Sequence, residues 1–430
     1  MHYRLNTALT FYFLLYAFAA WAQPAEKCGN DKMLRSLFLN DPDAEQNFKR
    51  IRTELQYRIN SNAFRLTEGA VITIPVVFHV IYNGEPQDSG ANISTAQIQS
   101  QIAVLNECFR LRNSDTAAIP SWFRGRQADI EVEFCLAAFD TAGLATSGIT
   151  RHSIANIGNF DTDVKPATQW NPANYLNIWT TTLSNQLLGY ATPPGLFPLN
   201  QDGIVMDYRT IGKAPFNPFA GPHDLGRSCV HEVGHWLNLL HTFADTCAGT
   251  TAQSCSTEGD FICDTPPSKG ATYGQPNLLQ NSCTETPVDE RDMWMNYMDY
   301  ADNDQTHLFT HGQRDVMRAT LATSRLSIQS GTGCNNGVGI AGVTNTFFSA
   351  SVFPNPSIGQ VQLQYTLNSA LPVLLKVSNA MGQPVLASQT ILPALTGNLT
   401  LNLTHLPAGL YFIYLQTPVS EKTLKFSLLH

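Results

Sequence analysis

Residues 231–241 read HEVGHWLNLLH, and this stretch decides how the chain is interpreted. Residues four apart lie on one face of an α-helix, so the imidazoles of His231 and His235 can hold one metal ion. A helix that continued would turn His241 away from this pair. We therefore expect the helix to end near Asn238, because Asn tolerates a left-handed backbone and the turn would bring His241 back as a third ligand.

Glu232 follows the first of these histidines, where it can activate an attacking water without binding the ion. Three histidine ligands leave one coordination position open, as a catalytic zinc ion requires. The sequence therefore predicts a hydrolase with one Zn²⁺, in which Glu232 is the general base and then the general acid. Two other interpretations stay open: Glu285 or Glu290 as the third ligand in place of His241, and an inactive metalloprotein that acts as a binding module or adhesin.

The same motif resembles the metzincin pattern H-E-x-x-H-x-x-G-x-x-H, with Asn238 in place of the usual Gly. Residues 296–300, NYMDY, are similar to the Met-turn of the pappalysin family of metzincin peptidases, and the resemblance covers roughly residues 71–326. It implies an endopeptidase that acts on proteins or peptides. It also implies that Met298 forms an apolar floor beneath the metal and that Tyr300 donates a hydrogen bond to the oxyanion of the tetrahedral intermediate.

Acidic residues supply two further expectations from this resemblance. Family members that cleave before basic residues carry an acidic group just after the Met-turn, so Asp304, with Asp302 as the alternative, implies a preference for Arg or Lys at P1′. The segment around Asp260 resembles the calcium-binding loop of the family. Calcium prefers hard oxygen ligands, and the expected ones are Asp260, Asp264 and the backbone of Thr265.

The nine cysteines include one in a Cys-Gly pair near the N-terminus. The family resemblance implies a disulfide between Cys247 and Cys283, and a replacement bridge is expected between Cys255 and Cys263. Cys28 resembles a cysteine switch, in which a thiolate takes the fourth position on zinc and keeps the precursor latent. Four cysteines stay unassigned: Cys108, Cys135, Cys229 and Cys334.

Hydrophobic patterning predicts an α+β fold. Buried or alternating strands are expected at 71–82, 129–138, 175–180 and 203–206, and helices from Ser94, at 223–240 and at 312–326. Ser94 is the expected N-cap of its helix, with Gln97 completing a capping box. The strands interleaved with two long helices favour a mixed α/β half-domain. The resemblance implies a metzincin-like catalytic domain, with a twisted mixed sheet and two long helices, followed by a loop-rich lower subdomain and a C-terminal helix.

The N-terminal end has the features of an export signal. Residues 1–22 combine Arg4, an apolar run and a small-x-small cleavage pattern, and the run is short for a membrane anchor. The rest divides into a charged pro-segment at 23–67, the catalytic domain at 68–330, a linker at 331–347 and a β-sandwich at 348–430. No later segment is long and apolar enough to span a membrane. The export signal predicts a secreted protein, located outside the cell or at its outer surface.

The C-terminal strands are interrupted by three motifs, PNP at 354–356, NAMGQ at 379–383 and LPAGLY at 406–411. Together they resemble the C-terminal sorting domain of the type IX secretion system, which implies the secretion machinery as a partner. A carbohydrate- or protein-binding sandwich is the alternative. A net charge of −8, with only 14% charged residues and no dense basic run, argues against nucleic acid as a partner.

Overall fold

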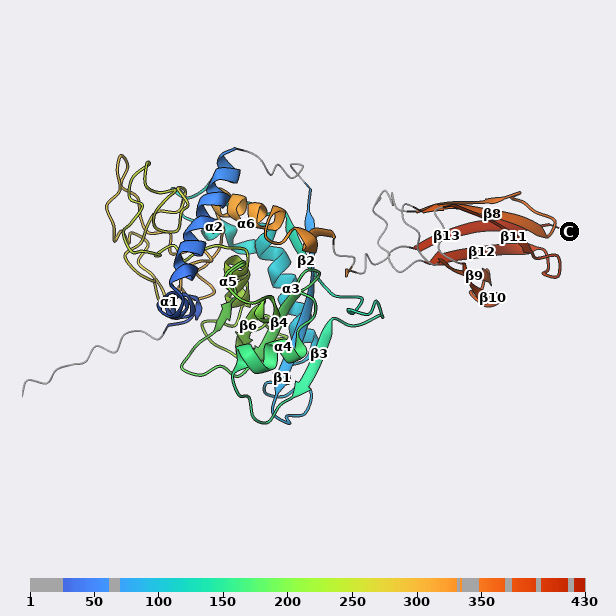
Figure 1. The fold of residues 1–430 in the computed structure, drawn as a ribbon, viewed down its shortest axis with the longest axis horizontal. Coiled ribbons are helices and arrows are strands. Elements are labelled where there is room, and N and C mark those ends of the chain that lie inside the picture. The colour runs from blue at the N-terminus through green and yellow to red at the C-terminus, as the bar shows by residue number, and fades with distance from the viewer. Residues whose placement is uncertain are drawn as a thin grey trace, which may run out of the picture.

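A computed structural model describes residues 26–61, 70–330, 333–334, 348–367, 373–391, 396–416 and 421–429. The expected signal peptide at 1–22 and most of the expected linker at 331–347 lie outside the described residues. The described chain forms an N-terminal body of helices and a mixed sheet and a separate C-terminal body of strands (Figure 1). The α+β class predicted from the sequence is confirmed.

The sheet of the first body has six strands. Five of them follow the order β2-β1-β4-β6-β5, and the sixth, β3, also pairs with β1. The strands are β1 Ile72–Tyr82, β2 Val132–Leu136, β3 Ile149–Ser153, β4 Leu176–Thr181, β5 Gly189–Ala191 and β6 Ile204–Asp207. All pairs are parallel except β5 with β6, so β5 is an antiparallel edge strand. β1 lies in the interior of the sheet, which explains its nearly continuous burial and its apolar, β-branched sequence.

Three longer helices belong to the same body. They are α3 Thr95–Phe109, α5 Arg227–Trp236 and α6 His311–Ala322. The Ser94 side chain accepts from Gln97 N at 3.0 Å, but the expected capping box is wrong, because the Gln97 side chain donates instead to Tyr208 O and Ile211 O. α5 is also shorter than the expected 223–240, since Gly226 has a left-handed φ of 72° and only Arg227 begins the helix.

Single helical turns connect the main elements. They are η1 Ser114–Ala118, the π-helical η2 Phe160–Val164, α4 Lys165–Thr168, η3 Leu199–Gln201, η4 Tyr208–Thr210 and η5 Leu326–Ser330. Residues 242–310 contain neither helix nor named strand, in agreement with the loop-rich lower subdomain expected there. Disulfides Cys247–Cys283 and Cys255–Cys263 cross-link this segment. A third disulfide, Cys135–Cys334, ties β2 to the chain after η5, a pairing that the sequence left unassigned.

Two helices of the expected pro-segment, α1 Asn30–Asn40 and α2 Pro42–Asn60, pack on the same body. α2 runs alongside α6 (Figure 1). Its buried Arg52 donates to the carbonyl of Asn238, and Gln56 donates to the carbonyl of Phe261 at 2.7 Å. The pro-segment therefore docks against the segment that leads from α5 to His241.

The C-terminal body is a β-sandwich of two antiparallel sheets with orders β10-β9-β12-β13 and β11-β8-β7. Its strands are β7 Phe348–Phe353, β8 Gln360–Leu367, β9 Val373–Asn379, β10 Pro384–Ile391, β11 Thr396–Asn402, β12 Gly409–Gln416 and β13 Glu421–Leu428. Val361, Leu363 and Tyr365 alternate with exposed neighbours and face a core formed within this body. Among the residues described, no helix has the length and apolar character needed to cross a membrane.

Candidate metal centre

Helix α5 and the turn after it position the residues of the 231–241 motif. His231, Glu232 and His235 lie on α5, which ends at Trp236. The expected turn is present at Asn238, which has a φ of 76°, and the chain then returns so that His241 lies beside the helix. Gly234 permits a further close approach, because a Cβ there would lie 2.5 Å from the Met298 sulfur.

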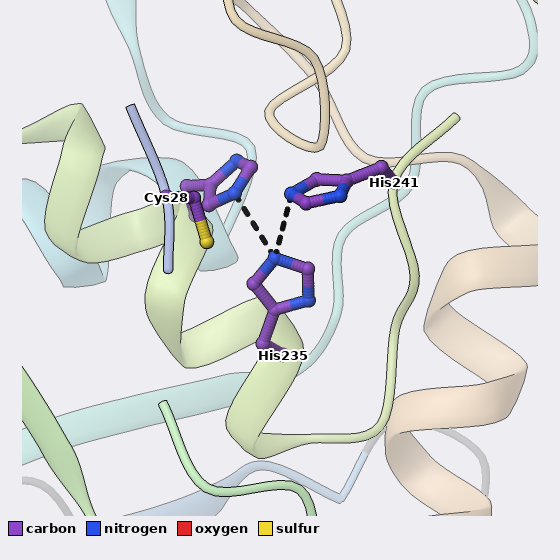
Figure 2. Close-up of side chains that lie close together, drawn as sticks. Cys28, His235 and His241 are labelled. Atoms are coloured by element: carbon purple, nitrogen blue, oxygen red, sulfur yellow. Dashed lines mark hydrogen bonds between the residues drawn. The ribbon is translucent and has the colours of Figure 1, made fainter. Parts of the chain in front are cut away.

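The structure brings four possible ligand atoms together, all within 4.8 Å of one another and all buried: Cys28 Sγ and one nitrogen each from His231, His235 and His241. The Nε2 atom of His235 lies 3.1 Å from the Nε2 atoms of both His231 and His241. In Figure 2 the Cys28 sulfur and the rings of His235 and His241 point toward a common centre. Two nitrogens bound tetrahedrally about 2.0 Å from one zinc ion would be about 3.3 Å apart, so the spacing fits.

The tautomers of the histidines explain why these close Nε2 atoms are not joined by simple hydrogen bonds. His231 Nδ1 donates to Tyr297 O at 2.6 Å, and His235 Nδ1 donates to Leu239 O at 2.9 Å. Burial lowers the pKa of His231 to about 3 and that of His235 well below its usual value, so both rings are neutral. Each Nε2 then presents a lone pair, and two facing lone pairs need a cation between them.

Cys28 is held beside this cluster by the backbone of the pro-segment. Leu188 N donates to Lys27 O at 2.8 Å, and Gly29 N donates to Gly189 O at 2.9 Å. Residues 27–29 therefore extend the sheet beyond β5, with Cys28 and Gly189 paired in parallel. This placement puts the backbone of the pro-segment directly beside the histidine cluster.

Glu232 lies beside the cluster, and its carboxylate is not among the converging ligand atoms. Burial raises its pKa to about 8. The Cys28 thiol donates to Glu232 Oε2 over 3.5 Å, and burial, followed by the charge of Glu232, raises the pKa of that thiol. In the described part of the chain, Cys28 is the side-chain partner found for Glu232, so this buried carboxyl is available to exchange protons with a small molecule at the centre.

The Met-turn residues lie against the histidines. Met298 is fully buried beneath Gly234. The Tyr300 ring packs edge-on to His241 with centroids 5.0 Å apart, and its hydroxyl donates to Cys28 O at 3.4 Å. The Tyr300 hydroxyl therefore already donates to a peptide carbonyl next to the cluster. Phe243 stacks on His241 with centroids 4.6 Å apart and also contacts the Tyr300 ring, with centroids 5.1 Å apart.

A pocket adjoins the cluster and receives the side chain of Lys27. The Lys27 ammonium donates to Tyr300 O at 2.9 Å and lies 3.6 Å from Asp302 Oδ1. Asp304 is exposed and accepts from Gln275 at 3.2 Å, so Asp302 is the nearer of the two carboxylates expected here. Asp299 also lines the pocket, and its buried Oδ2 has no hydrogen-bond partner among the residues that the structure describes.

The residues expected to bind calcium are engaged within the protein. Asp260 accepts from Ile262 N and from the Thr265 hydroxyl, at 3.0 and 2.6 Å. Both oxygens of Asp264 accept bonds at the start of α6, from the Thr310 hydroxyl and from Gly312 N. Asp264 therefore caps α6, a structural role that the sequence did not reveal.

The glutamates considered as an alternative third ligand lie outside the cluster. Glu290 pairs with Arg126 at 2.5 Å, and Glu285 accepts from Glu290 N at 3.0 Å. Sequence reasoning missed three residues at the site: Lys27, Asp31 and Asp299. For Asp31 a signal existed, because it follows Cys28 by three residues, which is about one helical turn.

Comparisons with known proteins agree with this geometry. The M43 peptidase profile, described as pregnancy-associated plasma protein-A, matches residues 158–322, and the secretion system C-terminal sorting domain matches 351–428. An extracellular metalloprotease of Verticillium alfalfae is 30% identical over 267 residues, which cover 60% of this chain and 79% of that relative.

Two solved structures of Tannerella forsythia proteins are also similar. A promirolysin mutant has 35% identity and a TM-score of 0.60, over 71% of this chain and 97% of its own. Mature mirolysin in complex with a cleaved peptide has 41% identity and a TM-score of 0.54, over 60% of this chain and 96% of its own.

The fold and these relatives define a secreted metalloprotease with a C-terminal sorting domain. The chain belongs to the M43, or pappalysin, family of metallopeptidases and is mirolysin-like. This family implies that the metal is zinc.

Proposed function

We propose that the chain is the latent precursor of a zinc endopeptidase, with His231, His235 and His241 as ligands and Glu232 as general base and acid. The observation that carries this proposal is the convergence of the three imidazoles beside a buried carboxyl. Neutral imidazoles and a thiol are ligand types that zinc prefers, so the residues fit the ion.

When bound, zinc would polarise the scissile carbonyl and make a water molecule more acidic. Glu232 accepts the proton of the attacking water and later passes it to the leaving amine. Tyr300, once the pro-segment has left, donates its hydroxyl hydrogen to the oxyanion instead of to Cys28 O. Met298 supports α5 from below and does not take part in proton transfer.

The test uses the processed enzyme and its Glu232→Gln variant, with metal analysis and a peptide-cleavage assay. We expect one zinc per chain in both proteins, and a loss of activity of about 10²- to 10⁴-fold in the variant. Glu107→Gln, a carboxylate paired with Lys213 away from the site, is the control and should keep its activity. Full activity of Glu232→Gln would contradict the proposal, and zinc retained by His241→Ala would favour a glutamate as third ligand.

Latency is proposed to depend on Cys28, whose sulfur lies among the ligand nitrogens. In the Cys28→Ala precursor the fourth position is free, so we expect faster activation and earlier peptide cleavage than in the wild-type precursor. Cys108→Ala removes another buried free thiol and is the matched control. Equal activation rates for Cys28→Ala and wild type would contradict the cysteine switch.

A preference for Arg or Lys at P1′ is proposed with Asp302 as the main determinant. Its support is Lys27, a basic side chain that lies in the pocket beside Asp302. We expect Asp302→Asn to reduce the ratio of kcat/KM for basic over apolar P1′ residues about tenfold, a change of about 1.4 kcal/mol. Asp304→Asn is the control, and a larger effect there would assign the preference to Asp304 instead.

A calcium role for the loop around Asp260 is a separate proposal. Its support is burial, which raises the pKa of Asp260 to about 8, because a cation beside this carboxyl would stabilise its charged form. Calcium should then raise the Tm of the wild-type protein but not that of Asp260→Asn. An equal response of both proteins would contradict a site at Asp260.

A further inference from the structure

The three clustered histidines differ in how their second ring nitrogen is satisfied. His231 and His235 donate to Tyr297 O and Leu239 O, which belong to the catalytic domain. His241 Nδ1 instead donates to Asp31 Oδ1 at 3.0 Å, and Asp31 belongs to the pro-segment. Within the described parts of the chain, Asp31 is the acceptor found for this nitrogen.

The geometry of the pro-segment explains how Asp31 reaches His241. Gly29, the residue before α1, has helical dihedrals of −82° and −2°, so the turn from Cys28 to Asp31 is helical. Side chains three apart on such a turn share one face, and both the thiol and the carboxylate therefore face the histidines. The backbone bonds of residues 27–29 to β5 fix this turn in place.

We propose that Asp31 is a positioning residue of the metal centre in the precursor, so that the pro-segment increases zinc affinity through His241 in addition to blocking the site. A carboxylate that accepts from Nδ1 fixes the tautomer with a free Nε2 lone pair and increases the basicity of that nitrogen. Removal of the pro-segment takes this acceptor away. Phe243 still stacks on the His241 ring and Tyr300 still packs edge-on against it, so the mature site keeps its shape but binds zinc less tightly.

This inference rests on the proposed zinc site, and it extends that proposal from blocking to metal retention. Latency needs only Cys28, whereas metal retention needs Asp31 as well. The two contributions are separable because the thiol approaches the common centre and the carboxylate approaches the far side of the His241 ring.

The experiment measures the zinc dissociation constant of the full precursor by competition with a chromophoric chelator. A Glu232→Gln background keeps every precursor intact. Four proteins are compared: the parent, Cys28→Ser, Asp31→Ala and the double variant. We expect Asp31→Ala to weaken zinc binding about 10- to 100-fold, in the presence and in the absence of the Cys28 thiol. Asp31→Asn keeps an acceptor oxygen without the charge of the carboxylate, so it should lose less zinc affinity than Asp31→Ala.

Glu45→Ala is the matched control, since it removes an exposed pro-segment carboxylate that pairs with Lys49. An unchanged dissociation constant in Asp31→Ala overturns the inference. A loss that disappears in the Cys28→Ser background also overturns it, because Asp31 would then act only by placing the thiol. A parent protein that binds no zinc would instead contradict the proposed metal site.

Discussion

At the scale of single residues, the site depends on what each imidazole does with its second nitrogen. Two backbone carbonyls and one carboxylate accept from the three Nδ1 atoms, and this leaves three Nε2 lone pairs directed at one point. Because burial lowers the pKa of His231 and His235, protonation does not compete with metal for these nitrogens near neutral pH.

Tyr300→Phe tests the oxyanion role at this scale. The variant keeps the ring that packs on His241 and loses only the hydroxyl, so we expect kcat to fall about 10²- to 10³-fold with little change in KM. Steady-state kinetics of the processed enzyme measures this. Unchanged kcat would assign Tyr300 a packing role alone.

Asn238 tests the turn that carries the third ligand. Its φ of 76° suits Gly or Asn but strains a β-branched residue by about 1–2 kcal/mol. We expect Asn238→Gly to keep zinc and Tm near wild type, and Asn238→Val to lower both the Tm and the zinc content. Thermal unfolding with metal analysis checks this, and a Val variant that matches wild type would contradict the role of the turn.

At the scale of elements, the sheet has a buried polar connection between three strands. His79 on β1 contacts Thr150 on β3 at 2.8 Å and Asn177 on β4 at 2.9 Å. Burial lowers the pKa of His79 to about 4 from its usual 6.5, although the bond to Asn177 acts in the opposite direction. The folded sheet therefore holds this histidine neutral under conditions in which the unfolded chain is protonated.

This difference predicts a pH-dependent stability. Below pH 6.5 the unfolded chain binds a proton that the folded chain does not, so stability falls as the pH drops from about 6.5 toward 4. In His79→Gln the change of the unfolding free energy with pH should be smaller by up to about 1.4 kcal/mol per pH unit. All six tryptophans precede the C-terminal strands, so tryptophan fluorescence in urea reports on the first body. The exposed His311→Gln is the control, and equal slopes for His79→Gln and wild type would contradict this prediction.

At the scale of the whole molecule, catalysis and export are assigned to different bodies. The C-terminal strands bury their own core, and the sorting-domain match at 351–428 falls within these strands. We infer that processing removes residues 23–67 at one end and cuts within 331–347 at the other, and the mass of the secreted protein tests this.

Deletion of residues 348–430 separates the two bodies experimentally. Because none of the metal-centre residues lies in the deleted segment, the truncated chain should still cleave peptides after lysis of the cells. It should not appear in the medium, since the sorting domain is gone. Activity in lysate and medium measures both effects, and undiminished secretion of the truncated chain would contradict the sorting role.

The sequence by itself determined the parts of this protein that depend on short spacing. A spacing of four positions places His231 and His235 on one helix face, an Asn permits the turn before His241, and alternating apolar residues define the C-terminal strands. The turn at Asn238, the α+β class and the sorting domain were predictable for this reason.

Only the tertiary structure decided which distant groups meet at the site. The acceptors for the three Nδ1 atoms, the pairing of residues 27–29 with β5 and the position of Lys27 beside Asp302 join segments far apart in the chain. The Cys135–Cys334 disulfide closes a separation of 199 residues. Such contacts depend on how the whole sheet and its helices pack, and no local pattern of side chains specifies them.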